Sequence, residues 1–399
     1  MKKSSLLLTF FRMTSICALS LHPNRGQSTP LLRKPLAKKI LVAYTSNHCQ
    51  DLDDMDKVTR AVQDGVNVLI WVFIAFEPVV VGDRTFDSSP ARLRMKSNLD
   101  VANYQLYRRK LADMGYSHVA HLVAFGGWNG PHLPPGYASK DLYEAFQTYN
   151  TQAGRTSEPL FDGIDWDLEG NDTLNSSTNE FTKECLDQMG EFSQMVKNDG
   201  FIVSMAPPES YLDITSSQFS RFVNLTYPEP WHQDFEYHGW NVYSYILAKW
   251  NDAIDFVFVQ FYESYSHATY QISNLEEDPG DFLISYVQQL VAQEEGMMVQ
   301  FEDDSSVGLK TQFVSLPLSK LVLGFANGWA LNSDLGEKVI FFESDALKNA
   351  YLALKHMKRE PRGMGFWVVE EEGKHGVYYA KDLNDILHLQ LEGTSGAII

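Results

Sequence analysis

Three carboxylates in the segment FDGIDWDLEG, residues 161–170, have a spacing suited to acid–base chemistry. Asp165, Asp167 and Glu169 recur with period two, so in a β-strand all three side chains point to the same face. Neighbours on that face lie about 6.6 Å apart along the strand. Carboxylates lined up inside a protein repel one another and lose solvation, which raises the pKa of at least one of them. A raised pKa is what a general acid near neutral pH requires.

Three other interpretations of this segment compete. The run from Asp165 to Gly170 fits the start of a calcium-binding EF-hand loop, but the twelfth position would be Ser176 rather than a glutamate, and strand-like residues precede it. A short D-x-D metal site of a nucleotide-sugar transferase is a second alternative. The third, a solvated acidic strand, is disfavoured because residues such as Ile164 and Trp166 make the opposite face apolar.

The elements that would position these carboxylates alternate between buried strands and amphipathic helices. Most of the strand candidates are short apolar runs rich in Val, Ile and Phe, as expected of parallel strands covered on both faces. They are Lys39–Tyr44, Val66–Phe76, His118–Gly127, Phe161–Glu169, Phe201–Pro207, Ile254–Glu263, Leu321–Ala326 and Gly363–Val369. Helical patterns, which parallel strands need as crossovers, cover Ala91–Met114, Ser139–Thr151, Thr178–Asn198, Gly280–Glu295 and Glu343–His356.

Eight strands with intervening helices predict a (β/α)8 TIM barrel, an α/β fold, as a single domain with enlarged loops at the C-terminal face of the strands. The alternative is an open, doubly wound sheet with a second domain. No G-x-G-x-x-G follows the first strand, so the dinucleotide-binding form of that alternative loses its main support. Glu169 ends its strand and would lie at the mouth of the barrel, where barrel active sites sit, so we expect it to be the acid.

The charge of the chain excludes several classes of partner. Its 399 residues contain 33 Lys and Arg against 51 Asp and Glu, a net charge of −18. This balance argues against nucleic acid and against an anionic membrane surface, and it favours an uncharged ligand.

The 3 cysteines are too few for a disulfide scaffold or for a zinc site built from cysteines alone. Cys49 and Cys185 either form a disulfide or remain free buried thiols.

The N-terminus resembles a secretory signal. Residues 1–20 combine Lys2 and Lys3 with an apolar stretch and small residues near a cleavage point, although a disordered tail is the alternative. We therefore expect a secreted, extracellular protein, with no membrane attachment after cleavage and a monomeric state. An N-terminal extension would cover 21–37, the catalytic barrel 38–390 and a tail 391–399. The N-x-S/T sequons that fit secretion are at Asn171, Asn175 and Asn224.

One segment between strands, residues 227–250, is unusually rich in aromatic side chains. It holds 8 of them in 24 positions, against 13% for the whole chain. On a loop at the strand ends, such rings would make platforms on which a sugar ring stacks. The alternative is that they pack the loop onto the barrel.

The pattern D-x-x-D-x-D-x-E at the end of a fourth barrel strand resembles glycoside hydrolase family 18, the chitinases and their relatives. Asp162, Asp165, Asp167 and Glu169 supply all four acidic positions, with Asp162 as a structural part of the motif. The resemblance extends over most of residues 38–390. Further matches are Ala124-Phe125-Gly126-Gly127-Trp128 after the third strand, Met205-Ala206-Pro207, Gln260-Phe261-Tyr262 on the sixth strand, and Trp367 on the eighth.

The resemblance implies a retaining mechanism without an enzyme nucleophile, an exception to the usual scheme of two carboxylates. Glu169 would protonate the glycosidic oxygen, and the N-acetyl carbonyl of the substrate would form an oxazolinium ion. Asp167 would orient the acetamido group, Asp165 would share a proton with Asp167, Tyr262 would donate to the acetamido carbonyl, and Trp367 would form the floor of the cleavage subsite. The other residues expected to bind substrate are Met205, Gln260, Gly127 and Trp128. No metal or organic cofactor is implied.

The implied activity is hydrolysis of β-1,4 linkages of N-acetylglucosamine in chitin. The alternatives are an endo-β-N-acetylglucosaminidase acting on N-glycans and a chitinase-like carbohydrate-binding protein without activity. Two departures from the family pattern matter: Ala124 replaces the usual Ser, and Glu263 follows Tyr262 where plant-type relatives often have Asn. Neither changes Glu169, whose equivalent such lectins usually lose.

Overall fold

The protein is a closed barrel of parallel strands in the computed structural model, which describes residues 35–79, 92–151, 159–173, 175–223, 241–263, 266–292, 296–332 and 339–390. Going round the ring, each strand pairs in parallel with the next, and β1 pairs with β2 to close it. The eight strands in that order are β1 (Ile40–Thr45), β11 (Gly363–Trp367), β10 (Leu321–Ala326), β7 (Phe256–Gln260), β6 (Ile202–Met205), β5 (Gly163–Leu168), β4 (Ala120–Gly127) and β2 (Val68–Pro78).

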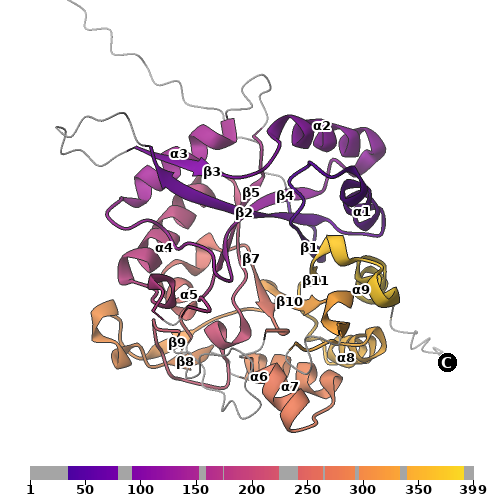
Figure 1. Ribbon diagram of the computed structural model, residues 1–399. Helices are drawn as coiled ribbons and strands as arrows, with labels where there is room; N and C mark the ends of the chain where they lie inside the picture. Colours follow the sequence, from indigo (N-terminus) through magenta and orange to yellow (C-terminus); the bar gives the residue numbers. More distant parts are fainter. Residues whose placement is uncertain are drawn as a thin grey trace, which may run out of the picture.

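Helices surround the ring of strands (Figure 1). Helix α4 illustrates why they form: Thr182 caps its N-terminus by accepting a hydrogen bond from the amide of Cys185, and buried apolar residues recur along one face at intervals of three and four. The described α-helices are α1 (Leu52–Gln63), α2 (Val101–Leu111), α3 (Ser139–Thr151), α4 (Lys183–Asn198), α5 (Ser244–Trp250), α6 (His267–Thr269), α7 (Pro279–Ala292), α8 (Ser344–His356) and α9 (Tyr379–Leu387).

The alternation of side chains along each strand produces two separate hydrophobic layers. One lies between the strands and the helices and includes Trp166 and Phe192. The other fills the barrel interior and includes Tyr44, Phe258 and Tyr262. A residue's position in a strand therefore decides whether it packs against helices or faces the interior.

The barrel prediction is confirmed, and all eight predicted strands are present. The helix predicted over Ala91–Met114 is wrong in its first part, because Leu93–Lys96 forms β3, which pairs antiparallel with the extended end of β2. The helix predicted to begin at Thr178 begins at Lys183 instead, after a short 3-10 turn. Helices α1, α5, α6 and α9 were not predicted.

A small antiparallel pair, β8 (Met297–Val299) and β9 (Gln312–Val314), lies outside the barrel near α5 (Figure 1). Within the described ranges, no helix has both the length and the apolar character needed to cross a membrane. The leader-like residues 1–20, the sequon at Asn224 and most of the aromatic-rich segment, through residue 240, lie outside the described residues.

Candidate active site

Strand β5 presents two carboxylates to the barrel interior. Asp165 and Asp167 are 0% and 3% exposed. The residues between and beside them, Ile164, Trp166 and Leu168, belong to the hydrophobic layer under the helices. The period-two prediction for this strand is therefore confirmed for Asp165 and Asp167, and the face that bears them is buried in the interior of the barrel.

Asp165 is held by hydroxyl groups at both of its carboxylate oxygens. The Tyr44 hydroxyl donates to Oδ2 at 3.0 Å, and the Ser204 hydroxyl donates to Oδ1 at 2.5 Å. Burial raises the pKa of Asp165 to about 6, and these two hydrogen bonds oppose the shift. Tyr44 keeps its proton, because burial and the charge of Asp165 raise its own pKa well above the ordinary value.

Asp167 is fixed by an amide from β7, which lies two strands away from β5 in the barrel. Gln260, the last residue of β7, donates to Oδ1 of Asp167 at 2.8 Å and to the carbonyl of Ala206 at 2.7 Å. Burial, followed by the charges of Glu169 and Asp165, raises the pKa of Asp167 well above its usual range. Asp167 also shares a hydrogen bond with Glu169, which requires one proton between the two carboxyl groups.

Glu169 follows the last residue of β5 and is partly exposed at the carboxyl end of the strand. Burial and then the nearby charge of Glu263 raise its pKa to about 8, so the carboxyl group holds its proton at neutral pH. A carboxylic acid that is protonated, partly accessible and placed at the mouth of a barrel is suited to general-acid catalysis.

The backbone around Glu169 is anchored at three consecutive positions. The Tyr243 hydroxyl donates to the preceding carbonyl at 2.9 Å, and the following amide donates to the Tyr211 hydroxyl at 3.1 Å. His132 Nε2 lies 2.8 Å from the carbonyl of Glu169 itself. Because a carbonyl only accepts, Nε2 carries the proton, and burial lowers the pKa of this histidine, favouring its neutral form.

Two predicted aromatic residues line the same interior. Tyr262 is buried, and burial together with the charges of Asp167 and Glu169 raises its pKa well above the ordinary value, so it remains a hydroxyl donor. Trp367 ends β11, with its ring centroid 5.6 Å from that of Tyr44 and stacked at 5.9 Å against Phe73. Gln260, Tyr262 and Trp367 are therefore brought together with the carboxylates.

Gly127 and Trp128 lie at the carboxyl end of β4. A side chain at Gly127 would meet the ring of Phe73 at 2.4 Å, so the glycine makes room for that ring. The Trp128 indole donates to Asp172 at 2.9 Å, which fixes an exposed ring beside the residues that follow β5.

Asp162 lies just before β5, at the opposite end of the strand from Glu169. It accepts hydrogen bonds from the Arg108 guanidinium at 3.1 and 3.2 Å and from the backbone amide of His121 at 2.8 Å. The structural role predicted for Asp162 is thus the attachment of β5 to β4 and α2.

One predicted site residue points away from the site. Met205 is fully buried in the layer between strands and helices, together with Val203. Because Ser204 points inward to Asp165, its neighbour Met205 must point outward. The expectation that Met205 lines the site is wrong.

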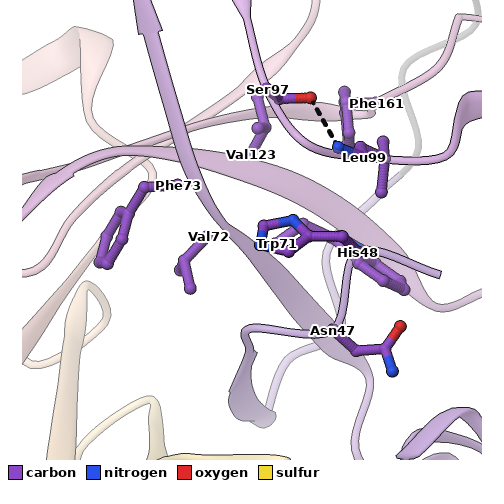
Figure 2. A pocket seen from close by; sticks show the side chains of 9 residues that line it. All are labelled: Asn47, His48, Trp71, Val72, Phe73, Ser97, Leu99, Val123 and Phe161. Atoms are coloured by element: carbon purple, nitrogen blue, oxygen red, sulfur yellow. Dashed lines mark hydrogen bonds between the residues drawn. The ribbon is translucent and has the colours of Figure 1, made fainter. Parts of the chain in front are cut away.

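A small hollow lies beside the barrel wall, and its nine lining side chains include Phe73 but none of the three carboxylates (Figure 2). It is bordered by Asn47 and His48 after β1, by Trp71 of β2 and by Ser97 and Leu99 after β3. Among the described residues, no group of three or more His, Cys, Asp or Glu side chains is arranged to hold a metal ion.

Three residues of the site, Tyr44, Ser204 and His132, were not predicted from the sequence. Tyr44 and Ser204 stand on predicted strands, so their inward orientation could have been inferred from period two relative to apolar neighbours. Their contact with Asp165 depends on strand register, which no local pattern encodes. His132 lies on a loop without a motif.

No protein-family model and no curated protein matches the chain. Among solved structures, a family 18 chitinase from Crocus vernus is 13% identical, with a TM-score of 0.49 over 87% of this chain and 99% of that one. A GH18 chitinase from Flavobacterium johnsoniae is 13% identical, with a TM-score of 0.48 over 88% and 94%. A fungal endo-beta-N-acetylglucosaminidase from glycosyl hydrolase family 18 is 13% identical, with a TM-score of 0.48 over 88% and 99%.

Proposed function

We propose that the protein is a glycoside hydrolase that cleaves β-1,4 linkages of N-acetylglucosamine in chitin or chitooligosaccharides. The observation that carries the proposal is the row of three carboxylates on the inner side of β5, with protonated Glu169 at its outer end. The buried Asp165 and Asp167 stand behind that acid, and Tyr262 is a neutral donor beside them. An uncharged polymer also suits a chain with a net charge of −18.

In the proposed reaction, Glu169 transfers its proton to the glycosidic oxygen as the bond from that oxygen to the anomeric carbon breaks. The acetamido carbonyl oxygen of the substrate forms a new bond to the same carbon and gives an oxazolinium ion. Water then opens this ion and returns a proton to Glu169, with overall retention of configuration.

The roles proposed for the neighbouring groups follow from their charges. When the proton shared by the two aspartates lies on Asp165, Asp167 is ionised, accepts the acetamido N–H and stabilises the positive charge of the oxazolinium ion. Tyr262, kept neutral by burial, donates to the acetamido carbonyl and holds it in position for attack. Trp367 offers an apolar ring against the sugar at the end of β11. Gln260 keeps Asp167 in place.

A matched pair of variants tests the assignment. Glu169→Gln keeps the shape of the side chain but removes the transferable proton, so kcat should fall by about 10²–10⁴-fold. Glu144→Gln, a change on the exposed face of α3, should leave kcat unchanged. The measurement is hydrolysis of fluorogenic chitin oligomers and, in parallel, of an N-glycopeptide.

The outcomes separate the alternatives. Cleavage of the glycopeptide but not of the oligomers would favour the endo-β-N-acetylglucosaminidase. Binding without cleavage of either substrate would favour a carbohydrate-binding protein, and full activity in Glu169→Gln would contradict the acid assignment. Oligomers with free glucosamine at the cleavage subsite should not be processed, because they lack the acetamido carbonyl.

A further inference from the structure

The inner carboxylate Asp165 receives its two hydrogen bonds from different sides of the barrel. Tyr44 reaches Oδ2 from β1, across the interior, whereas Ser204 reaches Oδ1 from β6, the strand next to β5. The two donors are 1% and 0% exposed, so bulk water does not replace either of them directly. Each therefore contributes a buried hydrogen bond to a charged group, the stronger class of such bonds.

Strand register shows that the two strands beside β5 place different side chains level with Asp165. Ala124 of β4 and Ser204 of β6 both lie level with Asp165, one on each side. Ala124 has no polar atom in its side chain, so only β6 supplies a hydroxyl at this level. The two neighbouring positions are thus equivalent in register but not in chemistry.

We infer that Ser204 is a positioning residue of the active site, which orients Asp165 and stabilises its ionised form from the β6 side. For its catalytic consequence the inference rests on the proposed function. Ser204 does not touch the reacting atoms; it acts through Asp165, which in turn governs how a proton is shared with Asp167.

The surroundings make this hydroxyl important. The titratable groups that face Asp165 from the described elements are Tyr44 from β1, Asp167 from β5 itself, Tyr262 after β7 and Tyr243 beside α5. None of these four groups carries a positive charge. An ionised Asp165 is therefore stabilised by hydroxyl donors alone. Removing one donor should shift the proton of the carboxylate pair toward Asp165.

The first measurement does not depend on activity. In the native protein the pKa of Asp165 is about 6, above its ordinary value. Asp165 therefore costs stability as the pH rises from that ordinary value to about 6, and its effect does not change further above that pH. Ser204→Ala should enlarge this effect. The difference in Tm between wild type and Ser204→Ala should consequently widen as the pH rises from about 4 to about 8.

A matched control and a rescue variant accompany it. Ser193 on α4 is also a buried serine; its hydroxyl accepts from the Trp166 indole at 2.8 Å on the outer face of β5. Ser193→Ala should lower Tm by the same amount at every pH. In the double variant Ala124→Ser/Ser204→Ala the hydroxyl returns on the other side of Asp165, and the pH-dependent difference should shrink.

The second measurement is the pH dependence of kcat/KM. One negative charge must remain on the Asp165–Asp167 pair, so Ser204→Ala should move the acidic limb to higher pH by roughly one unit. The basic limb should stay in place. Adding Ala124→Ser should reverse the shift of the acidic limb. If Ser204→Ala does not fold, Ser204→Cys, a weaker donor of similar size, takes its place with a smaller shift.

A Tm difference that is constant with pH would overturn the role of Ser204, as would an unmoved acidic limb in an active variant. A wild-type protein that cleaves neither chitin oligomers nor the glycopeptide would overturn the proposed function instead, and the pH dependence of Tm would still decide the role of Ser204.

Discussion

At the scale of single residues, the site is a set of carboxyl groups made different by their surroundings. Asp165 is the most enclosed and has two hydroxyl partners, whereas Glu169 is partly exposed and lies near the charge of Glu263. Burial raises the pKa of all three members of the row, but to different extents. Such a separation assigns the roles of acid and charge stabiliser to neighbouring groups of the same type.

These values predict a bell-shaped pH dependence of kcat/KM. Activity should fall as the pH rises through about 8, because Glu169 loses the proton that it must donate. It should also fall as the pH decreases through about 6, because protonation around Asp165 removes the negative charge needed beside the oxazolinium ion. Steady-state kinetics in buffers of constant ionic strength from about pH 4 to 10 would measure both limbs.

Two variants assign the limbs. Glu169→Gln should remove the basic limb together with most of the rate, and the Ser204→Ala variant should move only the acidic one. A basic limb that persists at the same pH in the residual activity of Glu169→Gln would contradict its assignment to Glu169.

At the scale of elements, the close approach of β4 to β5 determines the position of Asp167. Gly126 has a φ of +106°, and a side chain there would lie 2.3 Å from the carbonyl oxygen of Asp167. Only glycine fits such a left-handed position against a neighbouring backbone. The glycine is therefore part of the positioning of the carboxylates, although it has no side chain.

We expect Gly126→Ala to destabilise the protein by more than the roughly 1–3 kcal/mol typical of backbone strain alone, and to reduce kcat by displacing Asp167. Gly136→Ala is the matched control, because Gly136 also has a positive φ, +81°, but no atom within 4 Å of the added methyl group. Urea denaturation and kcat should be measured for both. Equal losses of stability in the two variants would mean that the contact with β5 is unimportant.

The elements themselves were largely predictable, because short apolar runs separated by amphipathic patterns specify a parallel barrel. The row of carboxylates was predictable for the same reason, since period two needs no knowledge of other strands. The hydroxyl groups of Tyr44 and Ser204 were not, because their contacts depend on which strands meet and in what register. Met205 was misassigned because a motif match gives a position along a strand but does not say to which side of the sheet the side chain points.

At the scale of the whole molecule, the candidate active site and most of the hydrophobic core lie in different layers of the barrel. The layer under the helices contains most of the buried hydrophobic side chains, and the interior layer is smaller and borders the site. Both described cysteines, Cys49 and Cys185, belong to the outer layer, are buried and are not linked to each other. Of the two alternatives left open by the sequence, the structure contains the free thiols.

These thiols should report on the unfolding of the whole barrel. Burial raises the pKa of Cys49 and of Cys185 to about 12, so neither is accessible or ionised in the native state at pH 8. The third cysteine of the sequence, Cys17, lies outside the described residues and is replaced by serine for this test. In the Cys17→Ser variant, a thiol reagent such as Ellman's should react rapidly with no thiol in the native protein and with two thiols in urea. Addition of a reductant should leave Tm unchanged; a fall in Tm would indicate a disulfide.

The alternation along β5 also limits how the gene for such a protein can change. Loss of one codon within Gly163–Leu168 would turn the carboxylates on one side of the deletion into the apolar layer under the helices and bring Trp166 or its neighbours into the interior. Fold and activity would be lost in the same step. Inactive descendants that still fold are therefore expected to arise by single-codon substitution at the carboxylates, while gaps accumulate in the loops.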